Sequence, residues 1–384
     1  MELNELDQHI LVLATLEETC SPVISCYLDL CSSDPDYRTV FDDRVQVLRR
    51  TIREELRRDF EQALAKIQEF LGARAIAGSS SLAIFSRAGE QPLFLPLSFG
   101  APLPNRIAVS SAPSIYGLVE LKDNYNRYVV LLATEHSAHI LGINLGSVTE
   151  EIWKTRPELR RRSGHEWTKE HYQNHRRERT RQFIHEQIRL LDQVVSRYGY
   201  AHIILAGNSR ATSAIKRELP KHLALKLVDV VPASAGDHSS DIVAATLQSF
   251  LEYEEGESLA VVDKLWRELN THGLAAAGTA ASMDALRNDQ VDVLVLAKTY
   301  QPGFGWACHK CSVLDVSSPQ PDGCSKCGYR WLRSFDVKEE MVRMAERAGC
   351  GVEVVEHSDR LLQLGGAACL LRYRLPAEQY RVAA

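Results

Sequence analysis

The hydrophobic positions of the chain recur with two different spacings, and these predict alternating strands and helices. Short runs of consecutive apolar residues predict strands. Apolar residues three or four positions apart predict helices instead. The predicted strands cover residues 23–30, 82–85, 128–133, 139–143, 202–206, 226–231, 291–297, 352–355 and 367–373. The predicted helices cover residues 40–71, 177–198, 240–251, 259–270 and 337–348, and a further helix is expected after Asn208.

The order of these elements predicts an α/β protein of three domains. Residues 1–111 form an N-terminal α/β domain, in which the proline-rich passage 91–107 is expected to supply edge strands. In residues 112–256, strands and helices alternate as in βαβ units, which predicts a layered domain with a largely parallel sheet. Residues 257–384 form a second layered α/β domain. A length of 384 residues is typical of two or three domains.

Four cysteines stand at the spacing of metal ligands in the last domain. Cys308 and Cys311 form one Cys-x2-Cys pair, and Cys324 and Cys327 form another after twelve intervening residues. Two such pairs favour a tetrahedral zinc ion and a zinc ribbon over residues 306–331; the alternative is a set of reduced thiols without metal. Four protein ligands leave no open position, so the predicted zinc is structural. The other five cysteines are expected to be small core residues: Cys20, Cys26, Cys31, Cys350 and Cys369.

Charge separates one segment from the rest of the chain. Residues 154–181 contain ten Lys or Arg and four acids, a balance of +6 in a chain whose net charge is −5, so the remainder carries −11. A basic segment on an acidic body predicts an arm that binds a polyanion; the alternative is a solvated, charged helix. The candidate RNA-binding residues are Arg160, Arg161, Arg162, Gly164, His165, Trp167, Lys169, Arg176, Arg177 and Arg179.

Other features of the sequence exclude several classes of protein. The acidic start is neither a signal nor a transit peptide, and the apolar runs are too short to span a bilayer, so we expect a soluble cytoplasmic protein without a membrane partner. Nine cysteines, an odd number, argue against a disulfide framework. No triad, Walker or His-Glu-x-x-His pattern appears, and we assign no catalytic residue. At the turn 207–210, Ser209 is expected to act as a plain helix N-cap rather than as part of a phosphate site.

Four features occur together in the middle and last parts of the chain. Two strands lead into a basic loop and an arginine-rich helix, and a zinc ribbon is expected within the last domain. The segment AERAGCGVEVVEHS follows the ribbon, and LGGAACLLRY stands at residues 364–373. With these features the chain resembles the archaeal and eukaryotic class-1 peptide-chain release factor family, which includes the rescue factor Pelota and closes on a similar Gly-Gly motif. The resemblance covers about residues 115–375.

The resemblance implies a ribosome-binding factor of the bacterial branch, similar to rescue factors or to Balon-type hibernation factors, with a translational GTPase as a further partner. The family's hydrolytic loop carries Gly-Gly-Gln. Here the nearest match is Ser163-Gly164-His165, and an ungapped count back from Glu178 places Trp167 at the glutamine. Residues 1–110 carry none of the family's stop-codon-reading motifs.

We therefore expect a protein that occupies the A site in rescue or hibernation, without reading a stop codon and without clear release chemistry. The alternative is a peptidyl-tRNA hydrolase, or release factor, with a divergent loop that uses His165 or another donor. A further alternative is an RNA-binding protein unrelated to translation, because a fold alone does not determine a function.

Overall fold

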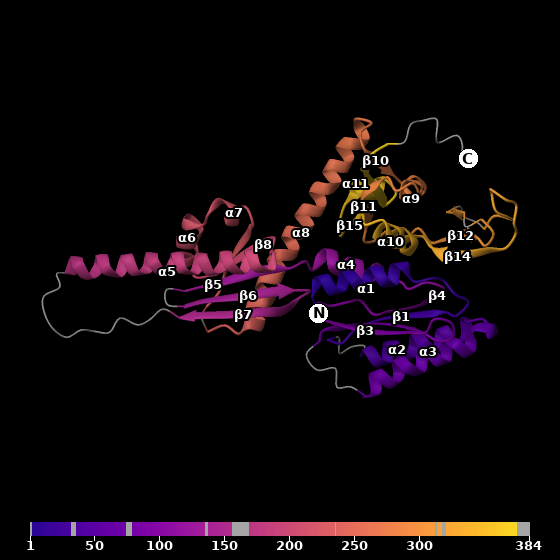
Figure 1. Cartoon of the computed structure of the whole chain (residues 1–384), viewed down its shortest axis with the longest axis horizontal. Helices are drawn as coiled ribbons and strands as arrows, with labels where there is room; N and C mark the ends of the chain where they lie inside the picture. The colour runs from indigo at the N-terminus through magenta and orange to yellow at the C-terminus, as the bar shows by residue number, and fades with distance from the viewer. Residues whose placement is uncertain are drawn as a thin grey trace. The chain divides into compact units, whose positions relative to one another are not determined.

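The protein divides by its internal contacts into two compact units, Tyr125–Glu254 and the combination of Met1–Asn124 with Glu255–Ala384. The computed structural model in Figure 1 describes residues 2–31, 36–73, 79–134, 137–155, 169–234, 236–311, 313–316 and 320–374. Several sheets with packed helices confirm the predicted α/β class. The division into three domains at residues 111 and 257 stays a prediction.

The unit Tyr125–Glu254 contains one five-stranded mixed sheet in the order β7-β6-β5-β8-β9. Its strands are β5 (Tyr128–Ala133), β6 (Ser137–Asn144), β7 (Ser147–Thr155), β8 (His202–Gly207) and β9 (Leu227–Pro232). The pairs β5–β8 and β8–β9 are parallel, but β5–β6 and β6–β7 are antiparallel. The expectation of a largely parallel sheet was therefore wrong: the short connections around β6 leave no room for crossover helices.

Helices cover both faces of this sheet, as Figure 1 shows. They are α5 (Lys169–Tyr198), α6 (Ser209–Glu218), α7 (Lys221–Ala224) and α8 (Ser239–Asn270). On one face of the sheet, residues of α5, α6 and α7 form a core with side chains of β5 and β8, among them Val129 and Ile203. Residues of α8 form the second core with Val130 and Ile204, the next position on each strand, because successive strand residues point to opposite faces. Burial on both faces explains why β5 and β8 are continuous apolar runs.

Two details of these helices differ from the sequence-based expectations. Helix α8 is continuous over 32 residues, where two helices were expected on either side of a glutamate-rich stretch containing Gly256. Glycine costs a helix about 1 kcal/mol relative to alanine, but buried Phe250 before it and buried Leu265 after it support the helix. The N-cap of α6 is Asn208, whose side chain accepts from the Ala211 amide at 2.8 Å, and not Ser209 as expected.

The N-terminal part of the other unit is a four-stranded antiparallel sheet in the order β3-β2-β1-β4. Its elements are α1 (Leu3–Thr15), β1 (Val23–Asp29), α2 (Tyr37–Thr51), α3 (Glu54–Ala73), β2 (Ser81–Arg87), β3 (Leu93–Phe99), β4 (Arg106–Ser110) and α4 (Tyr116–Asn124). The proline-rich passage supplies the edge strands β3 and β4, as predicted. The single helix expected over residues 40–71 is two helices, because Ile52 adopts an extended backbone (φ −71°, ψ 139°).

The C-terminal part of this unit contains a second four-stranded sheet in the order β10-β16-β11-β15. Its elements are β10 (Ala275–Ala277), α9 (Thr279–Arg287), β11 (Val291–Ala297), α10 (Val337–Arg347), β15 (Gly351–Val355), α11 (Asp359–Gln363) and β16 (Ala367–Leu371). Between α11 and β16 stand Gly365 and Gly366 with φ angles of 90° and 76°. A Cβ on Gly366 would lie 2.8 Å from the Tyr300 ring, so both conformation and space require glycine there.

A three-stranded antiparallel ribbon is inserted between β11 and α10. Its strands are β12 (Phe304–Cys308), β13 (Leu314–Asp315) and β14 (Leu332–Asp336), in the order β13-β12-β14. Cys308 pairs with Leu332, and Phe304 pairs with Asp336 at the opposite end of the same two strands.

A buried ionic network joins the segment after α1 to α10 and to the ribbon strand β14. Glu18 accepts from both Arg343 and Arg333, and Arg343 also contacts Glu340. The Arg347 side chain donates to the backbone oxygen of Ala14 at 2.6 Å. Burial alone would raise the pKa of Glu18, but hydrogen bonds and charge from Arg343, with a smaller contribution from Arg333, lower it below its usual value.

A second ionic contact connects three helices of the same unit. Lys122 on α4 contacts Asp7 on α1 at 2.8 Å and Glu346 on α10 at 3.7 Å. Burial raises the pKa of Glu346, while the neighbouring Lys122 opposes that shift. Helix α10 is thus held by ionic contacts to elements from the first third of the chain.

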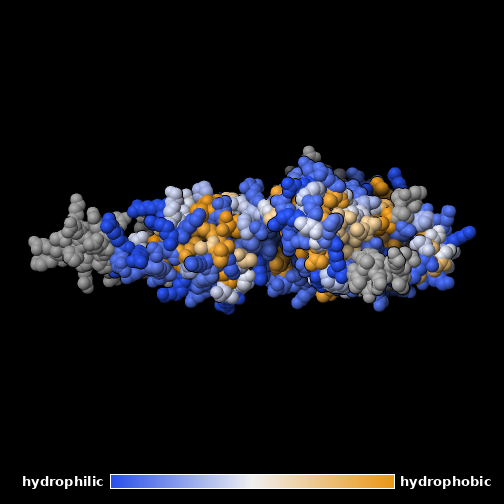
Figure 2. All heavy atoms as spheres, turned by 90° about the horizontal axis from the view of Figure 1, so that it is seen from above, coloured by the Kyte–Doolittle hydropathy of each residue, from blue (hydrophilic) through white to orange (hydrophobic). Residues whose placement is uncertain are grey.

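The surface corrects one further expectation. Cys20 and Cys31 are exposed, whereas Cys26, Cys350 and Cys369 are buried core residues as predicted. Hydrophilic side chains cover much of the face shown in Figure 2, with hydrophobic residues between them. Among the described residues, no helix combines the length and the apolar character needed to cross a membrane.

Candidate functional site

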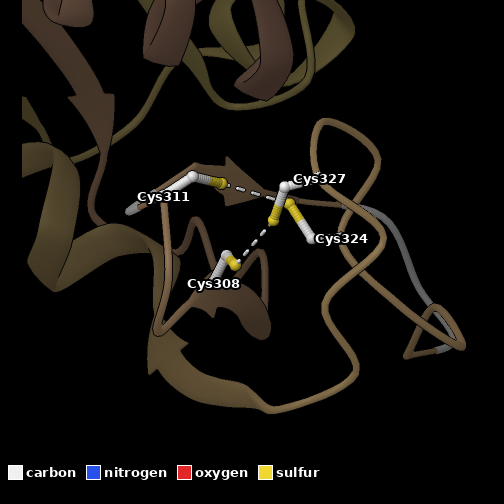
Figure 3. Close-up of side chains that lie close together, drawn as sticks. All are labelled: Cys308, Cys311, Cys324 and Cys327. Carbon is white, nitrogen blue, oxygen red and sulfur yellow. Dashed lines mark hydrogen bonds between the residues drawn. The ribbon is translucent and has the colours of Figure 1, made fainter.

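The four clustered cysteines come together at one end of the ribbon. Their Sγ atoms all lie within 4.8 Å of one another. The Sγ atoms of Cys308 and Cys327 are 3.6 Å apart, and those of Cys311 and Cys324 are 3.4 Å apart. Figure 3 shows the four side chains turned toward a common centre, with each contact joining a cysteine of one pair to a cysteine of the other.

Backbone hydrogen bonds form a tight turn around each cysteine pair. Within the first pair, the Lys310 amide donates to Cys308 Sγ at 3.4 Å. Around the second pair, Gly328 donates to the Cys324 oxygen, and the Cys324 amide donates to the Tyr329 oxygen, both at 2.9 Å. Gly328 has a φ of 67°, a conformation that favours glycine. These turns bring the sulfurs of each pair to one side.

Backbone amides favour ionised thiolates at Cys324 and Cys308. Hydrogen bonds from the backbone amides of Cys327 and Lys326 lower the pKa of Cys324 to about 6. Burial opposes ionisation of Cys308, but the amides of Cys311 and Lys310 outweigh it and lower the pKa of that thiol. At Cys311 the Val313 amide favours the thiolate, but burial and the neighbouring cysteine sulfurs raise the pKa of that thiol to about 12. Because thiolates rather than thiols bind metal ions, the lowered pKa values of Cys308 and Cys324 suit metal binding.

The sulfur positions fit a tetrahedral metal ion. Metal–sulfur bonds of about 2.3 Å, the zinc value, separate the sulfurs of a tetrahedron by about 3.8 Å. The two short separations of 3.4 and 3.6 Å and the 4.8 Å limit for all pairs bracket this distance. The residues present therefore fit one metal ion with four thiolate ligands and no position left for a substrate.

The basic segment leads into α5, a helix of 30 residues and therefore about 45 Å long at 1.5 Å per residue. Its C-terminal part is packed: Phe183, Ile188 and Leu191 are buried against the sheet. None of the residues 177–182 is buried. The packed part fixes the direction of the helix, and residues 177–182 before it are exposed or half-buried.

The candidate RNA-binding residues are only partly placed by the structure. Arg177 is exposed and Arg179 is half-buried, and neither forms an ion pair with another residue of the described ranges. Lys169 and Arg176 lie in α5 by their backbone. Arg160, Arg161, Arg162, Gly164, His165 and Trp167 lie outside the described residues. The structure therefore places Lys169, Arg176, Arg177 and Arg179 on the same helix, α5.

Sequence reasoning missed an exposed aromatic residue at the start of the basic segment. Trp153 on β7 is 57% exposed and stacks on His139 of β6, with ring centroids 3.8 Å apart. His139 Nε2 lies 2.7 Å from Glu151 Oε1. Burial lowers the pKa of His139, and Glu151 opposes that shift. The sequence does show an aromatic residue directly before Lys154. Because strand β7 was not predicted, however, the sequence did not indicate that this ring would stack on His139.

Residues 113–250 match the sequence model of the family described as bacterial archaeo-eukaryotic release factor family 10. Over these residues the chain is similar to that family, and the resemblance seen in the sequence is confirmed there.

Several solved structures are similar to this chain. One is a model of ribosome-bound archaeal Pelota with ABCE1, at 14% identity and a TM-score of 0.41 over 97% of this chain and 95% of that chain. Another is Saccharomyces cerevisiae Dom34, at 12% identity and a TM-score of 0.40 over 78% and 81%. A third is the C-terminal domain of the Methanosarcina mazei peptide chain release factor, at 25% identity and a TM-score of 0.29 over 37% and 99%. No curated protein matches the chain.

Proposed function

We propose that the protein is a cytoplasmic, ribosome-binding translation factor that occupies the A site in rescue or hibernation without reading a stop codon. The observation that supports this function most directly is α5, which is anchored in a release factor-type domain and presents exposed arginines before its packed part. Cations at the exposed part of a rigid helix can contact RNA phosphates without refolding of the domain. The resemblance also implies a translational GTPase as a second partner.

We also propose that the four-cysteine cluster holds zinc. Four thiolates at these separations favour zinc over harder cations such as magnesium or calcium, which prefer oxygen ligands. When bound, the metal ties the two cysteine pairs together. The ribbon residues themselves orient the thiolates and supply amide hydrogen bonds, so the proposed role is structural.

Removing exposed arginines from α5 should flatten the salt dependence of ribosome binding. We expect the double variant Arg177→Gln and Arg181→Gln to bind less tightly at low salt, with a shallower slope of log K against log salt concentration. Each lost phosphate contact reduces that slope by about 0.7 to 0.9. The measurement is co-sedimentation with purified ribosomes across a salt series. Adding Arg160→Ala, Arg161→Ala and Arg162→Ala should reduce the slope by up to about three further contacts.

The matched control is Arg189→Gln, an exposed arginine within the packed part of the same helix. It should leave the slope unchanged, and circular dichroism should show the same helix content in all variants. An unaltered slope in the α5 double variant and in the loop triple variant would mean that the basic segment is a solvated surface. Absence of co-sedimentation for the unmodified protein would contradict the proposed function itself.

Bound protein should not release the nascent peptide. Hydrolysis of the ester requires one positioned water, and a displacement of about 1 Å can cost on the order of a hundredfold in rate. The loop offers only Gly164 near His165, with Trp167 close by, instead of Gly-Gly-Gln. We expect the peptide to remain attached on ribosomes that carry peptidyl-tRNA, with or without a stop codon in the A site, while stoichiometric binding persists.

The assay separates released peptide from peptidyl-tRNA, with puromycin treatment of the same ribosomes as the positive control. A neutral histidine can act as a general base near neutral pH, so His165→Ala is the informative variant. Release well above background that His165→Ala abolishes would favour a peptidyl-tRNA hydrolase over a non-enzymatic factor.

A further inference from the structure

The ribbon exposes two aromatic rings beside the cysteine cluster. Trp331 is 74% exposed and Tyr329 is 39% exposed. They stand two residues apart, directly after the second cysteine pair. Aromatic rings normally contribute to cores or interfaces, because their large apolar surface is poorly accommodated by water. Two exposed rings at the cysteine end of the ribbon offer an aromatic surface on which a ligand can stack.

The backbone of these two residues is tied to the cysteine turns. The Tyr329 oxygen accepts from the Cys324 amide at 2.9 Å, and the Trp331 oxygen accepts from the His309 amide at 3.4 Å. Trp331 also directly precedes Leu332, which pairs with Cys308. Each ring thus extends from backbone that is hydrogen-bonded to one of the two cysteine pairs, which limits the entropy lost when a ligand stacks on it.

Exposed cations lie close to the two rings along the chain. Lys310 lies within the first cysteine pair, Lys326 lies within the second, and Arg330 stands between the two aromatic residues. None of the three forms an ion pair with another residue in the described part of the chain. Residues 306–311 and 324–331 contain no Asp or Glu. Three exposed cations close along the chain to two exposed rings favour an anionic ligand that also carries aromatic groups.

We propose that this surface binds unpaired RNA, with one base stacked on Trp331 and the neighbouring phosphates contacted by Lys310, Lys326 and Arg330. Bases of single-stranded RNA present free faces to an aromatic ring, whereas duplex RNA keeps its bases stacked internally. The site goes beyond the proposed A-site function, because it lies in the ribbon rather than on α5. It would give the protein a second RNA contact that recognises unpaired nucleotides.

The test measures the affinity of the full, zinc-loaded chain for a fluorescently labelled single-stranded RNA of mixed sequence, by anisotropy. Trp331→Ala removes one base–aromatic stack and should weaken binding by about tenfold. Trp331→Tyr, which keeps a ring, should retain most of the affinity. The matched control is Phe304→Ala: this residue is 65% exposed but lies at the far end of β12 from the cysteines. Metal analysis confirms equal zinc content in all variants.

The basic loop could mask this effect, so each ribbon variant is also made in a background of Arg160→Ala, Arg161→Ala and Arg162→Ala. The tenfold loss should persist there. A second readout uses 5-fluorotryptophan: the chain has five tryptophans, and the Trp331 fluorine resonance is the one missing from Trp331→Tyr. Single-stranded RNA should shift that resonance, and a duplex of the same length should not.

Two outcomes would overturn the proposal. One is an unchanged affinity of Trp331→Ala for single-stranded RNA together with an unmoved Trp331 resonance. The other is unchanged RNA affinity together with lost ribosome co-sedimentation, which would identify an acidic ribosomal protein as the ligand instead. Failure of the proposed A-site function can be distinguished from failure of this RNA site. In the first case the protein would not co-sediment with ribosomes, but the Trp331-dependent binding of free RNA would remain.

Discussion

Replacing Cys311 with serine should remove the bound zinc and unfold the ribbon. The ribbon consists of three short strands, of which β13 has two residues, and it has little apolar surface of its own to bury. Structural zinc sites contribute about 10–16 kcal/mol of apparent binding free energy to small metal-dependent folds. A serine hydroxyl is a poor substitute for a thiolate ligand, so we expect zinc content to fall from about one ion per chain to a small fraction of that.

Metal analysis of the purified protein measures the loss, and hydrogen exchange shows where structure is lost. Amides of β12 and β14 should exchange rapidly in Cys311→Ser, while those of β5 and β8 should keep their protection. The control is Cys20→Ser, because Cys20 is an exposed cysteine outside the cluster and should be neutral in both measurements. Unmodified protein that contains no zinc after preparation without chelators would contradict the zinc assignment.

Replacing Arg343 with alanine should destabilise the unit that contains α10 by about 3–5 kcal/mol, the usual cost of removing one partner from a buried ion pair. The side chain is 5% exposed and bridges Glu18 and Glu340, so its removal leaves two carboxylates short of a partner in a poorly hydrated environment. Arg333 would still contact Glu18 at the edge of the network, which places the expected loss toward the lower end of that range.

The network also predicts a pH dependence. The pKa of Glu18 is lowered in the folded protein, so its ion pairs stabilise the fold above the ordinary glutamate pKa of 4.5. That contribution is lost as the pH falls through the lower folded value. In Arg343→Ala, most of this acid-side loss of stability should disappear, because less stabilisation remains to be titrated.

Urea denaturation between pH 3 and pH 7, followed by hydrogen exchange of α10 and α1, measures both effects without assuming that the whole chain unfolds in one step. The control is Arg360→Ala, which removes an exposed ion pair with Asp263 in the same unit. Exposed pairs contribute about 0–1 kcal/mol, so this change should be small and nearly independent of pH. A similarly small effect of Arg343→Ala would mean that water solvates the network well.

The sequence predicted those elements whose residues are either all buried or set at a fixed ligand spacing. The apolar runs of β5 and β8 predicted strands because both faces of these strands are buried. The two Cys-x2-Cys pairs predicted the cluster because ligand spacing is itself local. By contrast, β7 was missed because it is an edge strand whose glutamates and exposed Trp153 obscure the alternation. The break at Ile52 was missed because no glycine or proline marks it.

The ionic network could not be predicted, because it depends on pairs that are far apart in the sequence. Glu18 and Arg343 are separated by 325 positions. Neither neighbourhood shows more than ordinary charged residues near a helix, and charged residues are mostly exposed in folded proteins. The exposure of Trp331 was equally invisible, because an aromatic residue beside a strand usually predicts a core position rather than a surface.

The contacts of α1 bear on how the protein can be divided into fragments. The release factor match begins at residue 113, and a truncated protein that starts there would keep α4 but lose α1. Lys122 would then lose Asp7, and Arg347 would lose the backbone oxygen of Ala14. A boundary drawn from family similarity alone would therefore cut through a folded interface, and poor yield of such a fragment would reflect the missing helix rather than the instability of the domain retained.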